Sequence, residues 1–379
     1  MATTEQRPYI GGQAVIEGVM MRSPLSFSIV VRRSSGELVV RERPVARAKT
    51  NAALRWPFVR GVTTLIEAIG LGSEALRFSS EIYERDHADP EAPPSGPGSS
   101  GTGHRGGPGA IGRSALQTLA FWMAALATHE PDPGASGPGA RGSGEADSGR
   151  RLVSMITIAI ALGMFIVLPQ AAAAFTSRVA GLELDLRSPL FQALTGAFKL
   201  TIVVGYLLLI RRIPEIRRVF QYHGAEHKTI STYEAGEPLA VSYAQAKTTL
   251  HPRCGTTFIV MVALVSIFVF SAVAPLLPRL QVSGLVENVL LVLLKLPFLL
   301  PIAAVTFEIQ RVFARYCRTG VLRALLWPGF LVQKITTIEP DAEQLEVALS
   351  ALRATLWRSK PRTALPCPEP TAPSATTKP

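Results

Sequence analysis

The chain has 379 residues, a formal net charge of +11 and 47% hydrophobic residues. Its apolar residues are concentrated in long blocks separated by basic loops, which indicates a membrane protein rather than a set of soluble domains. No basic stripe interleaved with aromatic residues is present, so no nucleic-acid partner is expected. The three cysteines are too few and too scattered for a disulfide framework and suit a reducing, cytosol-facing environment.

The N-terminal region, residues 1–84, is predicted to be cytoplasmic and to hold a β-hairpin and an amphipathic helix. Its first ten residues are polar, so no cleavable signal peptide is expected. β-Branched runs at residues 28–33 and 37–43 flank a Ser-Ser-Gly turn, which is typical of a hairpin. Over residues 57–79 apolar side chains recur at helical spacing, which predicts a helix that packs on the membrane helices or lies in the interface.

A linker, residues 85–150, is expected to be mostly disordered. Glycine, proline and serine dominate residues 86–112 and 129–149. Between these stretches, residues 114–128 are apolar but too short to cross a bilayer, and we expect a short interfacial or re-entrant helix there.

Four apolar blocks are long enough to cross a bilayer and predict a four-helix transmembrane bundle over residues 151–310. They are residues 152–175, 190–210, 256–277 and 286–309. The basic flanks place both termini and the loop 211–255 in the cytoplasm of a bacterial cell, with a multi-pass protein in its cytoplasmic (inner) membrane. Lys199 and Lys295 fall inside the second and fourth blocks, where they either line the bundle interior or snorkel to the interface.

The C-terminal region, residues 311–358, is predicted to be helical and cytoplasmic. Asp341 and Gln344 have the spacing of a capping box. The apolar face of the helix that follows comprises Leu345, Ala348, Leu349, Leu352 and Leu356. A Pro/Thr/Ala tail, residues 359–379, is expected to be disordered. The predicted fold is thus an α-helical integral membrane protein with about four transmembrane helices, a small N-terminal β-hairpin and helix region, and a cytoplasmic C-terminal helix.

The segment Tyr222–Lys228 carries the residues best suited to chemistry. If it is helical, His223 and His227 lie one turn apart on one face, and two such imidazoles can bind one divalent metal. Glu226 beside them can serve as a ligand or as the base that activates water. The order His-x-x-Glu-His is also found in the inverzincin metalloproteases.

Half of the six histidines fall in one predicted loop, because His251 and Cys254 follow in the segment His-Pro-Arg-Cys. Together with His223 and His227 they would form a tetrahedral set suited to Zn²⁺. With Cys254 as the fourth ligand the site would be closed and structural; without it an open position would remain, and Glu226 would be the catalytic base. The alternative is that the histidines meet lipid headgroups or helix ends and that Cys254 is a small buried residue.

Several charged residues are candidates to support such a site. Lys228 and Arg253 could hold an anionic group. In the glycine-rich stretch at residues 11–22, Glu17 and Arg22 either complete a site or pair with each other. Glu308 and Arg311 lie one turn apart at the end of the fourth block and form either part of the site or a local ion pair.

These segments resemble the YqhQ-like family of bacterial integral membrane proteins of unknown function, described as metal-dependent enzymes. The matching motifs are Gly11 to Arg22, Pro57-Phe-Val-Arg-Gly61, Tyr222 to Lys228, His251-Pro-Arg-Cys-Gly255, Phe307-Glu308 with Arg311, and Thr336-Thr-Ile-Glu-Pro340 with the helix after it. The resemblance covers most of the chain outside the linker and the tail. The long insertion at residues 86–149 departs from the family, which speaks against His87, His104 and His129 as ligands.

The leading functional hypothesis is a membrane-embedded, zinc-dependent hydrolase acting on a lipid, lipid-linked or membrane-protein substrate at the cytoplasmic face. The lipid bilayer is the expected partner, and the oligomeric state is left open. The alternatives are a non-enzymatic scaffold with a structural Zn²⁺ site and an oligomeric transporter.

Overall fold

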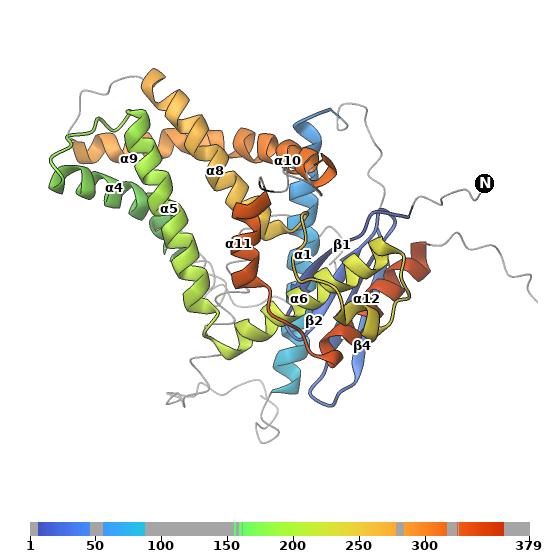
Figure 1. Cartoon of the computed structure of the whole chain (residues 1–379). Coiled ribbons are helices and arrows are strands. Elements are labelled where there is room, and N and C mark those ends of the chain that lie inside the picture. The colour runs from blue at the N-terminus through green and yellow to red at the C-terminus, as the bar shows by residue number, and fades with distance from the viewer. Residues whose placement is uncertain are drawn as a thin grey trace, which may run out of the picture.

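The computed structural model describes residues 7–45, 56–87, 155–156, 159–160, 162–277, 284–316, 324 and 326–359. The predicted helix at 114–128, nearly all of the linker and the C-terminal tail lie outside the described residues. The described part is mostly helical, with one small sheet near the N-terminus (Figure 1).

The sheet is an antiparallel meander of four strands in the order β1-β2-β3-β4. The predicted hairpin is confirmed as β3 (Ser26–Arg32) and β4 (Leu38–Pro44). Two further strands were not predicted, β1 (Gly11–Val15) and β2 (Gly18–Arg22), because the glycines at their ends were interpreted only as turn residues. Ile16 and Glu17 connect these strands, and Glu17 has a φ of 51°, a left-handed conformation uncommon for a residue other than glycine.

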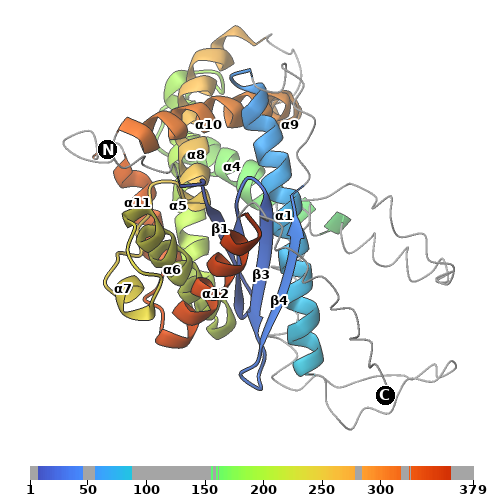
Figure 2. The same cartoon turned by 90° about the vertical axis from the view of Figure 1, so that its right-hand side faces the viewer.

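Alternate side chains along each strand point to opposite faces of the sheet, and helices cover both faces over β2 and β3. Val19, Met21 and Val30 belong to a core shared with α12 (Ala342–Ser359) and α6 (Pro214–Ala235). Met20 and Ile29 belong to a core with α1 (Val59–Asp86), which confirms the helix predicted at 57–79. Figure 2 shows the sheet between α1 on one side and α6 and α12 on the other.

Three described helices are long and apolar enough to cross a membrane, which indicates a membrane protein. They span Pro189–Ile210, Gly255–Leu276 and Val289–Phe313. The first comprises α5, the second α8 (Gly255–Val273) with a short 3₁₀ turn, and the third runs from α9 (Gly284–Lys295) into α10 (Leu299–Tyr316). A 3₁₀ turn at Leu296–Phe298 separates α9 from α10, where proline at position 297 cannot continue the α-helical hydrogen bonding.

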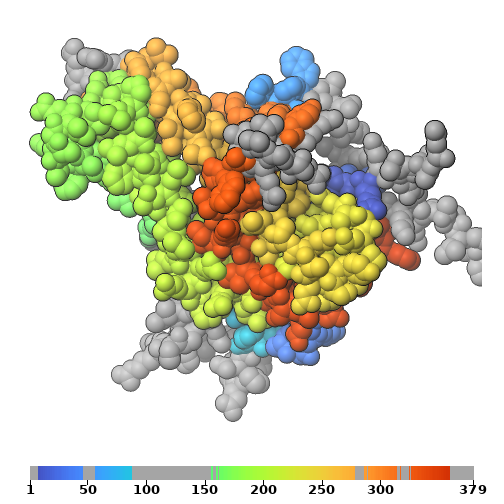
Figure 3. Space-filling model, in the orientation of Figure 1, coloured from blue at the N-terminus to red at the C-terminus, as the bar shows by residue number. Residues whose placement is uncertain are grey.

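The first predicted span, residues 152–175, lies partly outside the described residues and is not among these three helices. Its described part forms a π-helical turn, Gly163–Val167, followed by α4 (Leu168–Val179). Figure 3 shows α4 and α5, in green, at one end of the molecule, with the yellow α6 and α7 segments and the orange-red α11 and α12 segments toward the other.

The segments outside the apolar helices complete the folded body beside the sheet. After α5 come α6 and the short α7 (Val241–Gln245), and after α10 come α11 (Trp327–Thr336) and α12. The predicted capping box is confirmed, because Asp341 Oδ1 accepts the Gln344 N–H at 2.8 Å and Gln344 Oε1 accepts the Asp341 N–H at 3.1 Å.

Candidate metal centre

The candidate centre lies on the buried face of α6, which confirms the predicted helix through Tyr222–Lys228. Proline at the first position of α6 fits its start, where the missing N–H is not needed. The helix packs against β1, β2 and α12, and this packing buries Glu226, His227 and Lys228. His223 and His227 stand one turn apart, with ring centroids separated by 4.5 Å.

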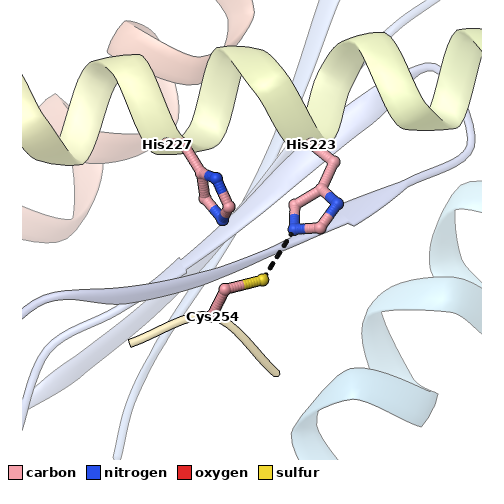
Figure 4. A group of neighbouring side chains, drawn as sticks. All are labelled: His223, His227 and Cys254. Atoms are coloured by element: carbon pink, nitrogen blue, oxygen red, sulfur yellow. Dashed lines mark hydrogen bonds between the residues drawn. The ribbon is translucent and has the colours of Figure 1, made fainter. Parts of the chain in front are cut away.

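Cys254 comes from the segment before α8 and meets both histidines (Figure 4). One ligand atom from each of His223, His227 and Cys254 lies within 4.8 Å of the other two. The closest pair is His223 Nε2 and Cys254 Sγ at 3.2 Å. The thiol also caps α8, since its sulfur accepts the Thr256 N–H at 3.4 Å. The structure therefore brings together three of the four predicted ligands, His223, His227 and Cys254.

Backbone carbonyl groups orient both imidazoles. His223 Nδ1 lies 2.9 Å from the carbonyl oxygen of Thr336, and His227 Nδ1 lies 2.5 Å from that of Thr249. A carbonyl can only accept a hydrogen bond, so each Nδ1 carries a proton, and each Nε2 is the ring nitrogen that faces the centre. Donation of the second ring nitrogen to a carbonyl is the arrangement usual for metal-bound histidines.

The electrostatics of the pocket favour a thiolate. Burial opposes ionisation of Cys254, but the neighbouring His223 and His227 outweigh burial and hold the pKa of the thiol well below its usual range. Burial lowers the pKa of His223, but the opposing effects of Cys254 and Glu226 are larger together and raise this pKa to about 9. For Glu226, burial raises the pKa of the carboxyl group against the opposing effect of the two histidines.

Glycines allow two other segments to approach α6. A Cβ on Gly12 of β1 would lie 2.7 Å from Cγ of Glu226, so only glycine leaves room for that carboxyl side chain. A Cβ on Gly224 would lie 2.1 Å from the carbonyl oxygen of Ile338, in the segment that follows α11. The motifs at residues 11–22, 222–228, 251–255 and 336–340, which are far apart in the sequence, therefore converge on one centre.

His251 lies beside the centre but outside the group of three. Its ring centroid is 5.6 Å from that of His227, and its Nε2 lies 3.7 Å from Glu234 Oε2. Gln333 of α11 holds its backbone, accepting the His251 N–H at 2.8 Å and donating to its carbonyl oxygen at 2.7 Å. His251 and Glu234 also line a cavity of about 330 Å³ bounded by Leu326 and Phe330.

The two nearby cationic residues have protein partners. Lys228 is 3% exposed and donates to the Gln245 carbonyl oxygen at 2.8 Å and to the carboxylate of Glu339. Arg253 pairs with Glu234 and lies 4.6 Å from the centroid of the Tyr9 ring. Lys228 therefore ties α6 to the segment before α12, whereas Arg253 lies next to the cavity that His251 lines.

The structure places the other candidates in ion pairs between elements. Glu17 does not pair with Arg22; it accepts hydrogen bonds from Arg218 of α6 at 2.5 and 2.6 Å, and from the hydroxyl of Tyr222 at 3.3 Å. Arg22 pairs with Glu67 of α1 at 2.5 Å.

Glu308 pairs with Arg60 of α1 at 2.5 Å, rather than with Arg311 in its own helix. In the same place Gly61 packs on Phe307, which a Cβ would approach to 3.1 Å. The motifs at residues 57–61 and 307–308 therefore meet each other at the junction of α1 and α10, not at the candidate metal centre.

Sequence reasoning missed Gly12, Gln333 and Glu234 as residues of the site. Gly12 lies in the glycine-rich motif at residues 11–22, so the sequence indicated that this position matters. It did not indicate that Gly12 would contact Glu226. Glu234 lies seven residues after His227, two helical turns along the same face of α6. Nothing in the sequence around Gln333 indicates its contact with His251.

Comparisons with known proteins give a family but no activity. Residues 56–358 match the family described as protein of unknown function (DUF1385). The chain is 29% identical to the Uncharacterized protein YqhQ of Bacillus subtilis (strain 168) over 352 residues, which is 92% of each chain. No solved structure matches. The family match covers most of the chain, and the protein therefore belongs to the DUF1385 family.

Proposed function

We propose that this protein is a membrane-bound, metal-dependent hydrolase in which His223, His227 and Cys254 hold one divalent ion, with Zn²⁺ the best match. The observation that carries the proposal is the approach of three ligand atoms within 4.8 Å, beside a buried carboxyl group. By the positive-inside rule, the centre would face the cytoplasm, where a lipid, lipid-linked or membrane-protein substrate could reach it.

The chemistry and spacing of the three side chains fit zinc. Tetrahedral bonds of about 2.1 Å to nitrogen and 2.3 Å to sulfur place two such ligands roughly 3.6 Å apart. The separation of 3.2 Å between His223 Nε2 and Cys254 Sγ is close to that value. Imidazole and thiolate are both ligands that suit Zn²⁺. The low pKa of Cys254 supplies a thiolate, and the Nδ1 hydrogen bonds of both histidines leave each Nε2 facing the centre. Because the pKa of His223 is about 9, an arriving metal ion would displace the proton on its Nε2.

Three protein ligands leave one tetrahedral position open, as in catalytic zinc sites. A zinc ion there would lower the pKa of a water molecule and polarise a carbonyl or phosphoryl oxygen. Glu226 would accept the proton from that water and return it to the leaving group. Burial raises the pKa of Glu226 above that of an ordinary glutamate, which suits a group that must both take and give a proton.

The remaining residues would bind substrate and position the base. Gly12 of β1 leaves the space that the Glu226 side chain occupies. The cavity lined by His251 and Glu234 lies on the His227 side of the centre and would admit part of a substrate. Arg253, which pairs with the cavity-lining Glu234, would meet an anionic group of that substrate.

A structural zinc site is the second candidate, and burial favours it. His227 is 1% exposed and Cys254 6%, and the cluster joins α6 to the start of α8. In that case the metal would only stabilise the fold, and the Glu226 carboxylate would have no role in turnover.

Metal analysis and a hydrolysis screen on the detergent-purified protein separate these functions. We expect about one metal ion per chain in wild type and Glu226→Gln, and loss of metal in His223→Ala and Cys254→Ser. Fluorogenic ester, phosphodiester and peptide substrates should be hydrolysed by wild type and not by Glu226→Gln. Equal hydrolysis by both proteins, with metal present, would contradict the catalytic proposal and favour the structural site.

A further inference from the structure

A second polar site lies among the apolar helices, away from the candidate metal centre. The lysines at positions 199 and 295, which interrupt two apolar blocks in the sequence, both line one cavity of about 40 Å³. The elements around it, α4, α5, α8 and α9, come together at one end of the molecule (Figure 1). Its polar lining consists of Gln170, Gln192, Thr195, Lys199, Ser266 and Lys295.

Lys295 is held in place by two amide side chains. Its Nζ donates to Gln170 Oε1 at 3.1 Å and to Gln192 Oε1 at 3.0 Å, and the residue is 8% exposed. An ammonium group has three N–H donors, so a third is left for another acceptor. The ring of Phe270, whose centroid is 5.5 Å from Nζ, covers one side of the ammonium group. The two amides thus fix Lys295 without neutralising it.

Lys199 adds a second positive charge to the same cavity. Among the described residues it has no hydrogen-bond or ion-pair partner, and no acidic side chain lines the cavity. Glu287 of α9 does not line the cavity and pairs with Arg187 at 2.8 Å. Two ammonium groups in apolar surroundings without a counter-charge are costly, and such residues in membrane helices commonly mark a ligand or ion site.

The size and position of the cavity define what can bind. One water molecule needs about 10–15 Å³ of such volume, so the cavity is large enough for one small anionic group but not for a whole lipid or nucleotide. Ser266 is twelve residues beyond Cys254 in the α8 segment, which corresponds to roughly 18 Å along the helix. The cavity is therefore separate from the candidate metal centre.

We propose that Lys199 and Lys295 form an anion-binding site inside the apolar helices that takes one phosphate or carboxylate group. The third N–H of Lys295 and the ammonium group of Lys199 would bind the anion, and the two glutamines would keep Lys295 oriented toward it. A lipid headgroup and a free anion share this chemistry, and the experiment distinguishes them.

The test is the thermal stability of the full-length protein in a neutral detergent, titrated separately with phosphatidylglycerol, phosphatidylcholine and sodium phosphate at constant ionic strength. A ligand that binds only the folded state raises the melting temperature. We expect stabilisation by phosphatidylglycerol or by phosphate, and none by phosphatidylcholine. A response to phosphatidylglycerol alone identifies a lipid headgroup, and a response to phosphate identifies a free anion.

Lys199→Met is the main variant, because removing Lys199 leaves no described partner unpaired, whereas Lys295→Met would orphan two amide oxygens. We expect Lys199→Met to weaken the response at least tenfold in ligand concentration and Lys199→Arg to retain it. Lys334→Met, at an exposed lysine of α11, is the control for non-specific attraction and should respond like wild type. An unresponsive wild type, or equal responses of wild type, Lys199→Met and Lys295→Met, would overturn the proposal.

Discussion

Replacing Gln333 by leucine removes a set of hydrogen bonds that supports the candidate centre from α11. The Gln333 side chain is fully buried. It accepts the His251 N–H, and its amide donates to the His251 carbonyl oxygen and to Thr257 Oγ1 at 2.6 Å. Leucine has a similar volume and can make none of these bonds, so the variant tests the hydrogen bonds rather than a cavity.

The expected loss follows from the groups left unpaired. Each buried backbone group without a partner costs about 1–3 kcal/mol, so the N–H and C=O of His251 together amount to about 2–6 kcal/mol. With a shift of about 2–4 °C per kcal/mol in medium-sized domains, the melting temperature should fall by at least about 4 °C. Because the same segment leads to Cys254, the affinity for metal should fall by about tenfold or more.

Thermal unfolding and competition with a metal chelator measure the two effects on the same preparation. Gln245→Leu is the matched control, since the Gln245 side chain is exposed and only its backbone carbonyl group is used, by Lys228. That variant should stay within about 0.5 kcal/mol of wild type. If Gln333→Leu melts and binds metal like Gln245→Leu, the arrangement of α11 around His251 is wrong.

Two further predictions concern the centre itself. Gly12→Ala should lower stability by about 1–3 kcal/mol in thermal unfolding, because its Cβ would overlap Glu226. Gly11→Ala, where the nearest atom would lie at 3.9 Å, should have little effect, and equal effects would contradict the close approach. In metal-free protein the thiolate absorbance of Cys254 should persist at pH values below the usual thiol pKa of about 8.5. His223→Gln should raise that pKa; an unchanged titration would contradict the pairing with His223.

Local features of the fold could be predicted from the sequence. The β3–β4 hairpin, α1, the helical course of residues 222–228 and the capping box of α12 depend on residues near one another in the chain, and all four are confirmed. The three apolar helices that can cross a membrane likewise follow from composition and length. The strands β1 and β2 were missed because each has only five residues and β1 begins with two glycines.

Partners distant in sequence could not be predicted, because they depend on how elements pack. Glu17 and Arg218 are 201 positions apart and meet only when β1, β2 and α6 come together. Glu308 had a basic residue three positions away in its own helix, yet it binds Arg60 across the α1–α10 junction. The same limit applies to the metal cluster, where spacing predicted His223, His227 and Cys254 but not that His251 would face Glu234.

X-ray absorption spectroscopy of the zinc-loaded, detergent-purified protein identifies the ligands of the metal ion. We expect two nitrogen ligands at about 2.0–2.1 Å and one sulfur ligand at about 2.3 Å, with a fourth light ligand. In Cys254→Ser the sulfur contribution should disappear. A spectrum without sulfur in wild type, or a protein that retains no zinc under loading conditions, would contradict a metal centre built from His223, His227 and Cys254.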